Sequence, residues 1–306
     1  MSKPEHIPVL LDEFLSFFED LKIKVFVDGT LGAGGHSLAL LEAHPEIEKL
    51  IGFDQDSQAI EIAKKRLESF KDKIVILEKN YCEMHEELKA QNISEVDGIF
   101  LDIGVSSMQL DQAERGFSFS KDGPLDMRMD RSCTLTAAEI VNTWSEKDLA
   151  DIFREYGDVA KWRLAAKKIV EERKVRRFKT TKDLVNLLSP FLRKSSKKSI
   201  HPLTLVFQAL RIAVNNELKV LGYTLPKVMP YLKSGGRLGV ISFHSGEDRI
   251  VKNSFRALSQ KKPQMGSEVK KPIALMITKK PVGPTDEECR RNPRSRSAKM
   301  RVLERI

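Results

Sequence analysis

Several residue types and patterns are scarce in this chain, and their scarcity narrows the possible functions. Only three of the 306 residues are cysteines, and Cys82, Cys133 and Cys289 lie far apart without a C-x-x-C spacing. The six histidines form no ligand pair, so we expect no disulfide framework and no bound metal. No apolar run reaches the roughly 20 residues of a membrane span, and no secretory leader is recognisable. We therefore expect a soluble, cytoplasmic protein.

Acidic residues are sparse in two stretches of an otherwise balanced chain. The sequence has 52 Lys and Arg against 43 Asp and Glu, a net charge of +9. Residues 161–200 hold fourteen basic and three acidic residues, so this segment carries +11 and the remainder −2. Residues 290–306 add seven basic residues and one acidic residue. Concentrated positive charge favours a polyanionic partner, most simply nucleic acid, although a solvated helix face with a basic tail is the alternative.

A short apolar run leads into a cluster of glycines at residues 24–37, KVFVDGTLGAGGHS. Residues 25–27 have the composition of a buried parallel strand, and the glycines let the backbone turn sharply and approach a ligand closely. We predict the first strand and the cofactor loop of a doubly wound α/β domain. The loop does not match the dinucleotide pattern G-x-G-x-x-G, because Ser37 occupies the position of the third glycine.

Asp28, directly before this loop, discriminates between cofactors. A carboxylate beside the turn would repel a pyrophosphate, whereas it would attract the sulfonium and ammonium cations of S-adenosylmethionine. The position of Asp28 therefore favours a methyl donor over a dinucleotide. A turn-stabilising or helix-capping aspartate is the alternative interpretation.

Two further predicted strands end on aspartate. Residues 49–54, 73–77 and 96–102 are strand candidates separated by helical patterns, which indicates a right-handed α/β winding. Asp54 lies about twenty residues beyond the glycines, where an acid can bind the hydroxyls of an adenosine ribose. Because parallel strands end at one edge of a sheet, we expect Asp28, Asp54 and Asp102 to lie along one rim.

The regular alternation stops after Asp102. The next convincing strand, residues 237–243, begins more than 130 residues later, although a parallel crossover needs only about a dozen residues. Helical periodicities fill the interval and carry the +11 segment, and Thr180 and Thr181 are candidate helix caps. We therefore predict a catalytic core of residues 1–112 and 203–306, with an inserted helical substrate-recognition domain at residues 113–202.

The N-terminal helix and the second part of the core, residues 203–306, are predicted mainly from apolar periodicity. A helical pattern covers residues 7–18, one long helix begins at Leu203, and a second ends at Gly235 and Gly236. Ser245 and Asp248 have the spacing of a capping box after the strand at 237–243. Residues 274–281 and 298–306 are candidates for a final antiparallel pair.

Seven segments spread over the whole chain closely resemble the RsmH/MraW family. The longest and most distinctive is RGFSFSKDGPLDMRMD at residues 115–130. The others are HIPVLL (6–11), DGTLGAGGHS (28–37), DGIFLDIGVSSMQLD (97–111), FQALRIAVNNEL (207–218), FHSGEDRIVK (243–252) and NPRSRSAKMR (292–301). Members are bacterial S-adenosylmethionine-dependent methyltransferases that act on N4 of a decoding-centre cytidine in 16S ribosomal RNA.

The resemblance implies a Rossmann-like class I methyltransferase sheet, S-adenosylmethionine as the cofactor, and 16S rRNA within the 30S subunit as the partner. We expect a monomer or weak homodimer that does not bind membranes. Tyr81 stands where members often carry Phe. The resemblance and the glycine loop together give the predicted cofactor-binding residues. They are Asp28, Gly32, Gly34, Gly35, His36, Asp54, Tyr81, Asp102 and Gln109.

The sequence contains no familiar motif for the group that would accept a proton from the methylated amine. Many amino-methyltransferases carry D/N/S-P-P-aromatic at the end of the fourth strand, but this chain contains no Pro-Pro pair. Asp102 and residues 104–107 occupy the corresponding place, so Asp102 and Ser106 are the predicted catalytic residues, with backbone carbonyls of this segment as the alternative to Ser106. An NAD-linked oxidoreductase and a catalytically silent RNA-binding assembly factor remain as alternatives from other functional classes.

Overall fold

The computed structural model describes residues 7–192, 200–260, 262–263 and 269–306. These residues form two compact units. Unit 1 comprises Met1–Gly104 and Leu218–Ile306, and unit 2 comprises Val105–Glu217. The insertion predicted at residues 113–202 lies within unit 2.

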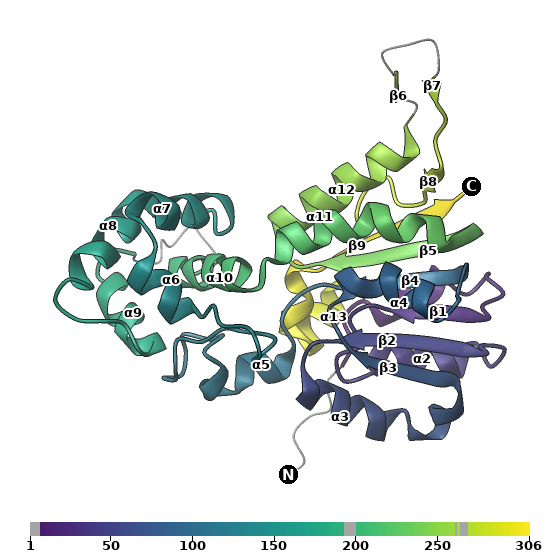
Figure 1. Ribbon diagram of the computed structural model, residues 1–306, viewed down its shortest axis with the longest axis horizontal. Helices are drawn as coiled ribbons and strands as arrows, with labels where there is room; N and C mark the ends of the chain where they lie inside the picture. The colour runs from purple at the N-terminus through teal and green to yellow at the C-terminus, as the bar shows by residue number, and fades with distance from the viewer. Residues whose placement is uncertain (1–6, 193–199, 261, 264–268) are drawn as a thin grey trace. The chain divides into compact units, whose positions relative to one another are not determined.

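Unit 1 is built on a seven-stranded sheet in the order β3-β2-β1-β4-β5-β9-β8 (Figure 1). Strands β1 to β5 pair in parallel, whereas β9 runs antiparallel to both β5 and β8. This order confirms the Rossmann-like class I methyltransferase sheet and the predicted final antiparallel pair. The strands are β1 (Val25–Asp28), β2 (Lys49–Asp54), β3 (Ile74–Glu78), β4 (Val96–Asp102), β5 (Leu232–Ser242), β8 (Ala274–Met276) and β9 (Lys299–Arg305), and β6 (Lys262–Pro263) pairs separately with β7 (Val269–Lys270).

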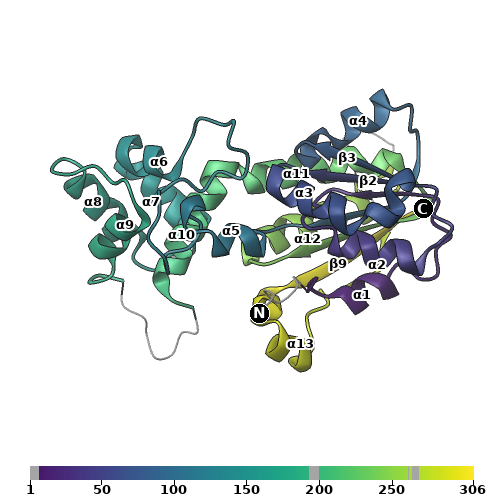
Figure 2. The same cartoon turned by 90° about the horizontal axis from the view of Figure 1, so that it is seen from below.

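Helices cover both faces of this sheet (Figure 2). Phe26 and Phe100 pack in one core layer, whereas their neighbours Val27 and Leu101 pack in the other, because successive side chains of a strand point to opposite faces. The first layer includes α1 (Leu11–Ser16), α2 (Gly35–Ala43) and α3 (Ser57–Arg66); the second includes α4 (Met84–Ala90), α11 (Glu217–Val228) and α12 (Ser245–Ser259). Within the described part of the chain, no helix has the length and apolarity needed to cross a bilayer.

Unit 2 is mainly helical and has its own core. Buried apolar side chains such as Phe153, Ile169 and Leu210 come from three different helices of the unit. Thr180 caps α9 and forms a capping box with Asp183, which confirms the cap predicted there. The elements are α5 (Ser107–Asp111), η3 (Ala113–Arg115), α6 (Ala137–Thr143), α7 (Glu146–Glu155), α8 (Trp162–Glu172), α9 (Thr181–Leu188) and α10 (Pro202–Asn215).

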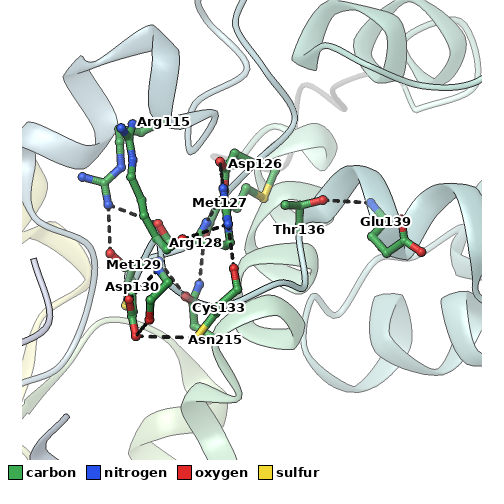
Figure 3. A network of polar contacts seen from close by, with 12 residues as sticks. Arg115, Asp126, Met127, Arg128, Met129, Asp130, Cys133, Thr136, Glu139 and Asn215 are labelled. Carbon is green, nitrogen blue, oxygen red and sulfur yellow. Dashed lines mark hydrogen bonds and ion pairs between the residues drawn. The ribbon is translucent and has the colours of Figure 1, made fainter. Parts of the chain in front are cut away.

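The distinctive segment at residues 115–130 folds into a polar network inside unit 2 (Figure 3). The Arg115 guanidinium donates to the carbonyls of Arg128 and Met129, both at 3.1 Å. The Arg128 side chain is paired with Asp126 at 2.7 Å, and the Met129 N–H donates to Asn215 Oδ1 at 2.8 Å. Both arginine side chains thus hold the loop together, so this segment has an architectural use in the unit.

The single long helix predicted from Leu203 is wrong. The helix stops at Asn215, and Asn216 adopts a left-handed conformation with φ of 52° before α11 begins. Asparagine tolerates this conformation better than most residues, and the apolar periodicity continues on both sides of it. The break is therefore invisible in the hydrophobic pattern.

The predicted helix end at Gly235 and Gly236 is also wrong. Helix α11 ends at Val228, just before Pro230, and β5 already begins at Leu232. Both glycines lie inside β5, where its pairing with β4 shifts register and Gly235 has a φ of 80°. The glycines serve an irregularity in a strand rather than a helix terminus.

The N-terminal helix is shorter than predicted because residues 7–10, here called the N-terminal strap, are not helical. Leu10 has a φ of 52°, and α1 starts only at Leu11. The Leu10 N–H donates to Glu288 Oε1 at 2.9 Å, and Glu288, in α13 (Asp286–Arg291), is buried. One carboxylate therefore ties the beginning of the chain to its last helix.

We predict that Glu288→Ala lowers the free energy of unfolding by about 1–3 kcal/mol, because a buried N–H loses its charged acceptor. Glu287→Ala on the same helix is the matched control, since Glu287 is exposed. Denaturant unfolding of both variants measures the difference. Equal stabilities would show that this bond contributes nothing to the fold.

Candidate active site

The predicted strand, glycine turn and helix are present at residues 25–43. Gly32 and Gly34 have φ values of 54° and 77°, the left-handed region in which side chains other than glycine are strained. At Gly35 an added Cβ would lie 2.6 Å from Pro8 Cγ, so the N-terminal strap also requires a glycine. These glycines fix the conformation of the loop beside the ends of β1 and β2.

Two of the predicted site carboxylates hold this loop in place. Asp28 accepts the Ser37 Oγ–H at 2.6 Å and the Thr30 N–H at 3.1 Å. Asp54 accepts the Gly32 N–H at 2.8 Å. Asp28 therefore has the turn-stabilising contacts of the alternative interpretation, and it is a buried negative group as well. Any cofactor contact of Asp28 comes in addition to these bonds.

Asp102 is placed differently from these two carboxylates. Its backbone N–H donates to Thr30 Oγ1 at 2.6 Å, which fixes the end of β4 against the glycine loop. Its side-chain Oδ2 lies 3.8 Å from His36 Nδ1. Its Oδ1 is buried and has no hydrogen-bond partner among the described residues. A buried acceptor without a partner is costly, so this atom is the best candidate for contact with a bound ligand.

Burial of these carboxyl groups raises their pKa values. The pKa of Asp102 rises to about 8, first because burial disfavours the charge and then because Asp28 and Glu247 repel it. Burial also raises the pKa of Asp28 to about 6, although the Ser37 hydrogen bond opposes the shift, and burial raises the pKa of Asp54. As predicted, the three aspartates end neighbouring parallel strands and form one acidic rim.

Glu247 was missed by the sequence argument. The predicted capping box of Ser245 and Asp248 is wrong by one residue: His244 is the N-cap of α12, and Glu247 completes the box. Asp248 instead binds Arg301, with 2.7 Å between Oδ1 and Nε. Glu247 is 2% exposed, so it brings another acid close to Asp102. Its place three residues after an N-cap is the signal that could have identified it.

The remaining predicted residues lie in both units. Tyr81 begins η2 (Tyr81–Glu83) just after β3, and it is partly buried. Ser106 and Gln109 belong to unit 2, where the Ser106 N–H donates to Gln109 Oε1 at 3.1 Å. The contacts of these three residues with a cofactor, like those of the rest of the set, stay a prediction.

The chemistry of the rim suits a cationic ligand. Buried carboxyl groups repel each other, and a cation beside them would relieve that repulsion, whereas a pyrophosphate would increase it. The unpartnered Asp102 Oδ1 can accept a hydrogen bond or face a positive charge. The residues present therefore fit S-adenosylmethionine and disfavour the dinucleotide of the alternative reading. No group of three His, Cys, Asp or Glu residues in the described part of the chain is arranged to hold a metal ion.

Comparison with known sequences identifies the family. The profile of the MraW methylase family matches residues 3–306. This chain belongs to that family. S-adenosylmethionine is accordingly its cofactor, as the acidic rim and the glycine loop indicated.

Individual relatives in the MraW methylase family are similar over nearly the full length. A ribosomal RNA small subunit methyltransferase H from Protochlamydia amoebophila is 55% identical over 98% of this chain and 97% of that protein. Proteins of the same name from Picosynechococcus and Chlamydia felis are 46% and 47% identical, and each alignment covers at least 98% of this chain and 96% of the relative. The crystal structure of an rRNA methylase from Streptococcus thermophilus aligns with 100% of this chain and 98% of that chain, at 11% identity and a TM-score of 0.44.

We predict that Asp102→Asn makes stability less dependent on pH. Because the pKa of Asp102 rises from 3.8 to about 8 on folding, its favourable contribution is fully present below pH ~4 and is lost as pH rises through about 8. Since 21% of the side chain is exposed, we expect the variant to gain about 1–3 kcal/mol over the wild type near pH 9. The gain should shrink as pH falls toward 5 and vanish below pH ~4.

Denaturant unfolding of the cofactor-free protein between pH 5 and 9 measures this effect. Asp72→Asn, at an exposed position, is the control. Parallel stability curves for the wild type and Asp102→Asn would contradict the predicted burial of the charge.

Proposed function

We propose that this protein methylates N4 of a decoding-centre cytidine in 16S ribosomal RNA, within the 30S subunit. The observation that carries the proposal is the full-length similarity to three relatives named ribosomal RNA small subunit methyltransferase H, joined to a methylase site with an unpartnered carboxylate oxygen. Choosing N4 of cytidine rests on the family resemblance of the motifs. The acidic rim agrees with it, because an amine acceptor develops positive charge as it is methylated.

The reaction needs alignment of two centres and removal of one proton. When bound, S-adenosylmethionine supplies a methyl group on a positively charged sulfur, which is an excellent leaving group. The cytosine amine is a weak nucleophile because its lone pair is delocalised into the ring. A carboxyl oxygen that accepts one N–H favours the reactive geometry and takes up developing charge. Asp102 is the proposed acceptor, and Ser106 is the proposed second polar contact.

The charge of unit 2 supports a polyanionic substrate. Part of the segment at residues 161–200 is used internally: Lys168 pairs with Glu171 at 2.7 Å, and Arg173 donates to the carbonyls of Val141 and Trp144. Other cations are exposed and make no ion pair within the described residues; they are Lys174, Arg177, Lys179 and Lys182. Arg193, Lys194, Lys197 and Lys198 fall outside the part of the chain that the structure describes.

The exposed cations follow one another between α8 and the first turn of α9. A series of side chains with this spacing can neutralise successive phosphates of an RNA strand. We therefore propose unit 2 as the substrate-recognition part of the enzyme. The target base must be unpaired or unstacked before its amine can reach a site at the end of β4.

The decisive experiment maps methylated bases in small-subunit rRNA. RNA from a strain that lacks the gene is compared with RNA from the same strain complemented by the wild type or by Asp102→Asn. Loss of one N4-methylcytidine in the decoding centre, restored only by the active protein, is the expected result. An unchanged methylation map would favour the catalytically silent assembly factor, and loss at another base would correct the substrate.

We predict that replacing Lys174, Arg177, Lys179 and Lys182 together by Gln weakens RNA binding and lowers the slope of log affinity against log salt by about 1–3, because fewer counterions are released. S-adenosylmethionine affinity should stay within about twofold. The control replaces four exposed lysines of unit 1, Lys22, Lys64, Lys65 and Lys71, and so removes the same charge. If both variants change the slope equally, net charge rather than this surface guides the RNA.

We also predict that Asp102→Asn lowers the single-turnover methylation rate about a hundredfold with both substrates saturating, the range typical of losing one proton-handling group. The amide keeps the size and one acceptor oxygen but cannot take a proton. If Asp102 only positioned the cofactor, the defect would appear in S-adenosylmethionine affinity and would largely disappear at saturation. A saturated rate within a few-fold of the wild type would remove Asp102 from the catalytic role.

A further inference from the structure

His36 makes a polar contact at each ring nitrogen. Its Nε2 lies 2.9 Å from the carbonyl oxygen of Val9, and its Nδ1 lies 3.8 Å from Asp102 Oδ2. The ring is packed edge-on or tilted against Phe14 and Phe100, at centroid distances of 5.1 and 4.8 Å. The imidazole is 8% exposed, so its orientation is fixed by the N-terminal strap on one side and the sheet on the other.

The contact with Val9 determines which nitrogen carries hydrogen. A backbone carbonyl can only accept, so His36 Nε2 must be the donor. In the neutral ring, Nδ1 then has a lone pair and no hydrogen. Nδ1 is the ring nitrogen that lies 3.8 Å from Asp102 Oδ2. The strap thus presents a basic nitrogen to the carboxyl group at the end of β4.

Asp102 is poorly suited to accept a proton alone. The charged groups that act on it are Asp28 on β1 and Glu247 on α12, both acidic, and the His36 ring on α2 lies 3.8 Å from its Oδ2. Burial, followed by repulsion from Asp28 and Glu247, raises the pKa of Asp102 to about 8. A carboxyl group with a pKa of about 8 is largely protonated near neutral pH in the cofactor-free protein, and from that state accepting another proton requires that the first one leave.

We propose that Asp102 and His36 form a proton relay in which Asp102 Oδ1 takes the proton of the methylated amine while Oδ2 passes its own proton to His36 Nδ1. The relay rests on the proposed amine methylation. His36 does not touch the substrate in this scheme. It is a positioning and proton-holding residue that acts through Asp102, in addition to any contact it makes with the cofactor.

The step balances in atoms and charge. The amine nitrogen uses its lone pair to bond the methyl carbon, while the carbon–sulfur bond breaks and its electron pair stays on sulfur. The N–H proton moves to Asp102 Oδ1, and the Oδ2 proton moves to His36 Nδ1. Asp102 remains a neutral acid, and His36 becomes an imidazolium. One positive charge has moved from the methyl donor to His36, and water takes its proton after product release.

The geometry gives this relay specific requirements. The separation of 3.8 Å between Nδ1 and Oδ2 must shorten by roughly 1 Å for a direct hydrogen bond, and it is too short to hold a bridging water. The imidazolium would lie beside neutral Asp102, and the negative charges of Asp28 and Glu247, which act on Asp102, would stabilise it.

The test compares His36→Gln with the wild type in saturated single-turnover methylation between pH 6 and 9. Glutamine retains an N–H donor for Val9 but has no basic nitrogen. We expect a rate loss of about tenfold to a hundredfold at pH 6–7, in the range for a proton-transfer group, that shrinks toward pH 9, where ionised Asp102 accepts the proton itself. His44→Gln, at the other end of α2, is the control.

A second measurement does not depend on turnover or on the RNA target. Long-range ¹H–¹⁵N spectra of the ¹⁵N-histidine-labelled full-length protein should show His36 with hydrogen on Nε2 in its neutral form. Asp102→Asn should change the pH at which His36 Nδ1 titrates. Hydrogen on Nδ1, or a titration unaffected by Asp102→Asn, would overturn the relay even if rRNA methylation is established.

The pH profile separates the relay from a structural role. A His36→Gln defect of constant size from pH 6 to 9, or a rate within about threefold of the wild type throughout, would overturn the relay. If the mapped base proves not to be a cytidine, the proposed function is corrected, while the spectra still decide whether His36 and Asp102 exchange a proton.

Discussion

The structure of unit 1 depends on keeping several carboxyl groups buried at the edge where its parallel strands end. Asp28, Asp54 and Asp102 terminate adjacent strands, and Glu247 joins them from α12. Burying like charges together is unfavourable unless protons, hydrogen bonds or a cation compensate. Loop N–H and O–H groups compensate the charges of Asp28 and Asp54, whereas Asp102 Oδ1 has no hydrogen-bond partner within the described part of the chain.

Hydrogen bonds couple the conformation of the glycine loop to the acidic rim. Asp54 binds the N–H of Gly32, and Thr30 receives the N–H of Asp102, so the loop conformation is set by the strand ends that it connects. The loop in turn places His36 on the first turn of α2, where the strap at Val9 holds its ring. A change at one strand end would therefore alter the loop, the histidine and the free carboxylate oxygen together.

Much of unit 1 could be predicted because buried parallel strands have a clear apolar signature. Strands β2 and β4 have the predicted bounds, and the gathering of three strand-end aspartates followed from topology alone. Features decided by tertiary contact could not be predicted in this way. The break at Asn216 leaves the helical period intact, and Gly235 has its left-handed conformation because β5 shifts register against β4. Glutamate is usually found at the surface, but Glu247 is buried where it completes the capping box of α12 with His244.

The absence of a Pro-Pro-aromatic motif becomes understandable in this setting. Where that motif would stand, β4 ends in an aspartate followed by Ile103 and Gly104. A carboxyl group has two oxygens, so in the proposed relay Asp102 faces the amine with one oxygen and His36 with the other. That arrangement works only if the base presents a lone pair, which requires its other nitrogen to be a donor. The carbonyl of Val9 imposes this state on His36 from a strap that is itself held by Glu288. The distant contact between the first and last helices of unit 1 therefore bears on the protonation of the site.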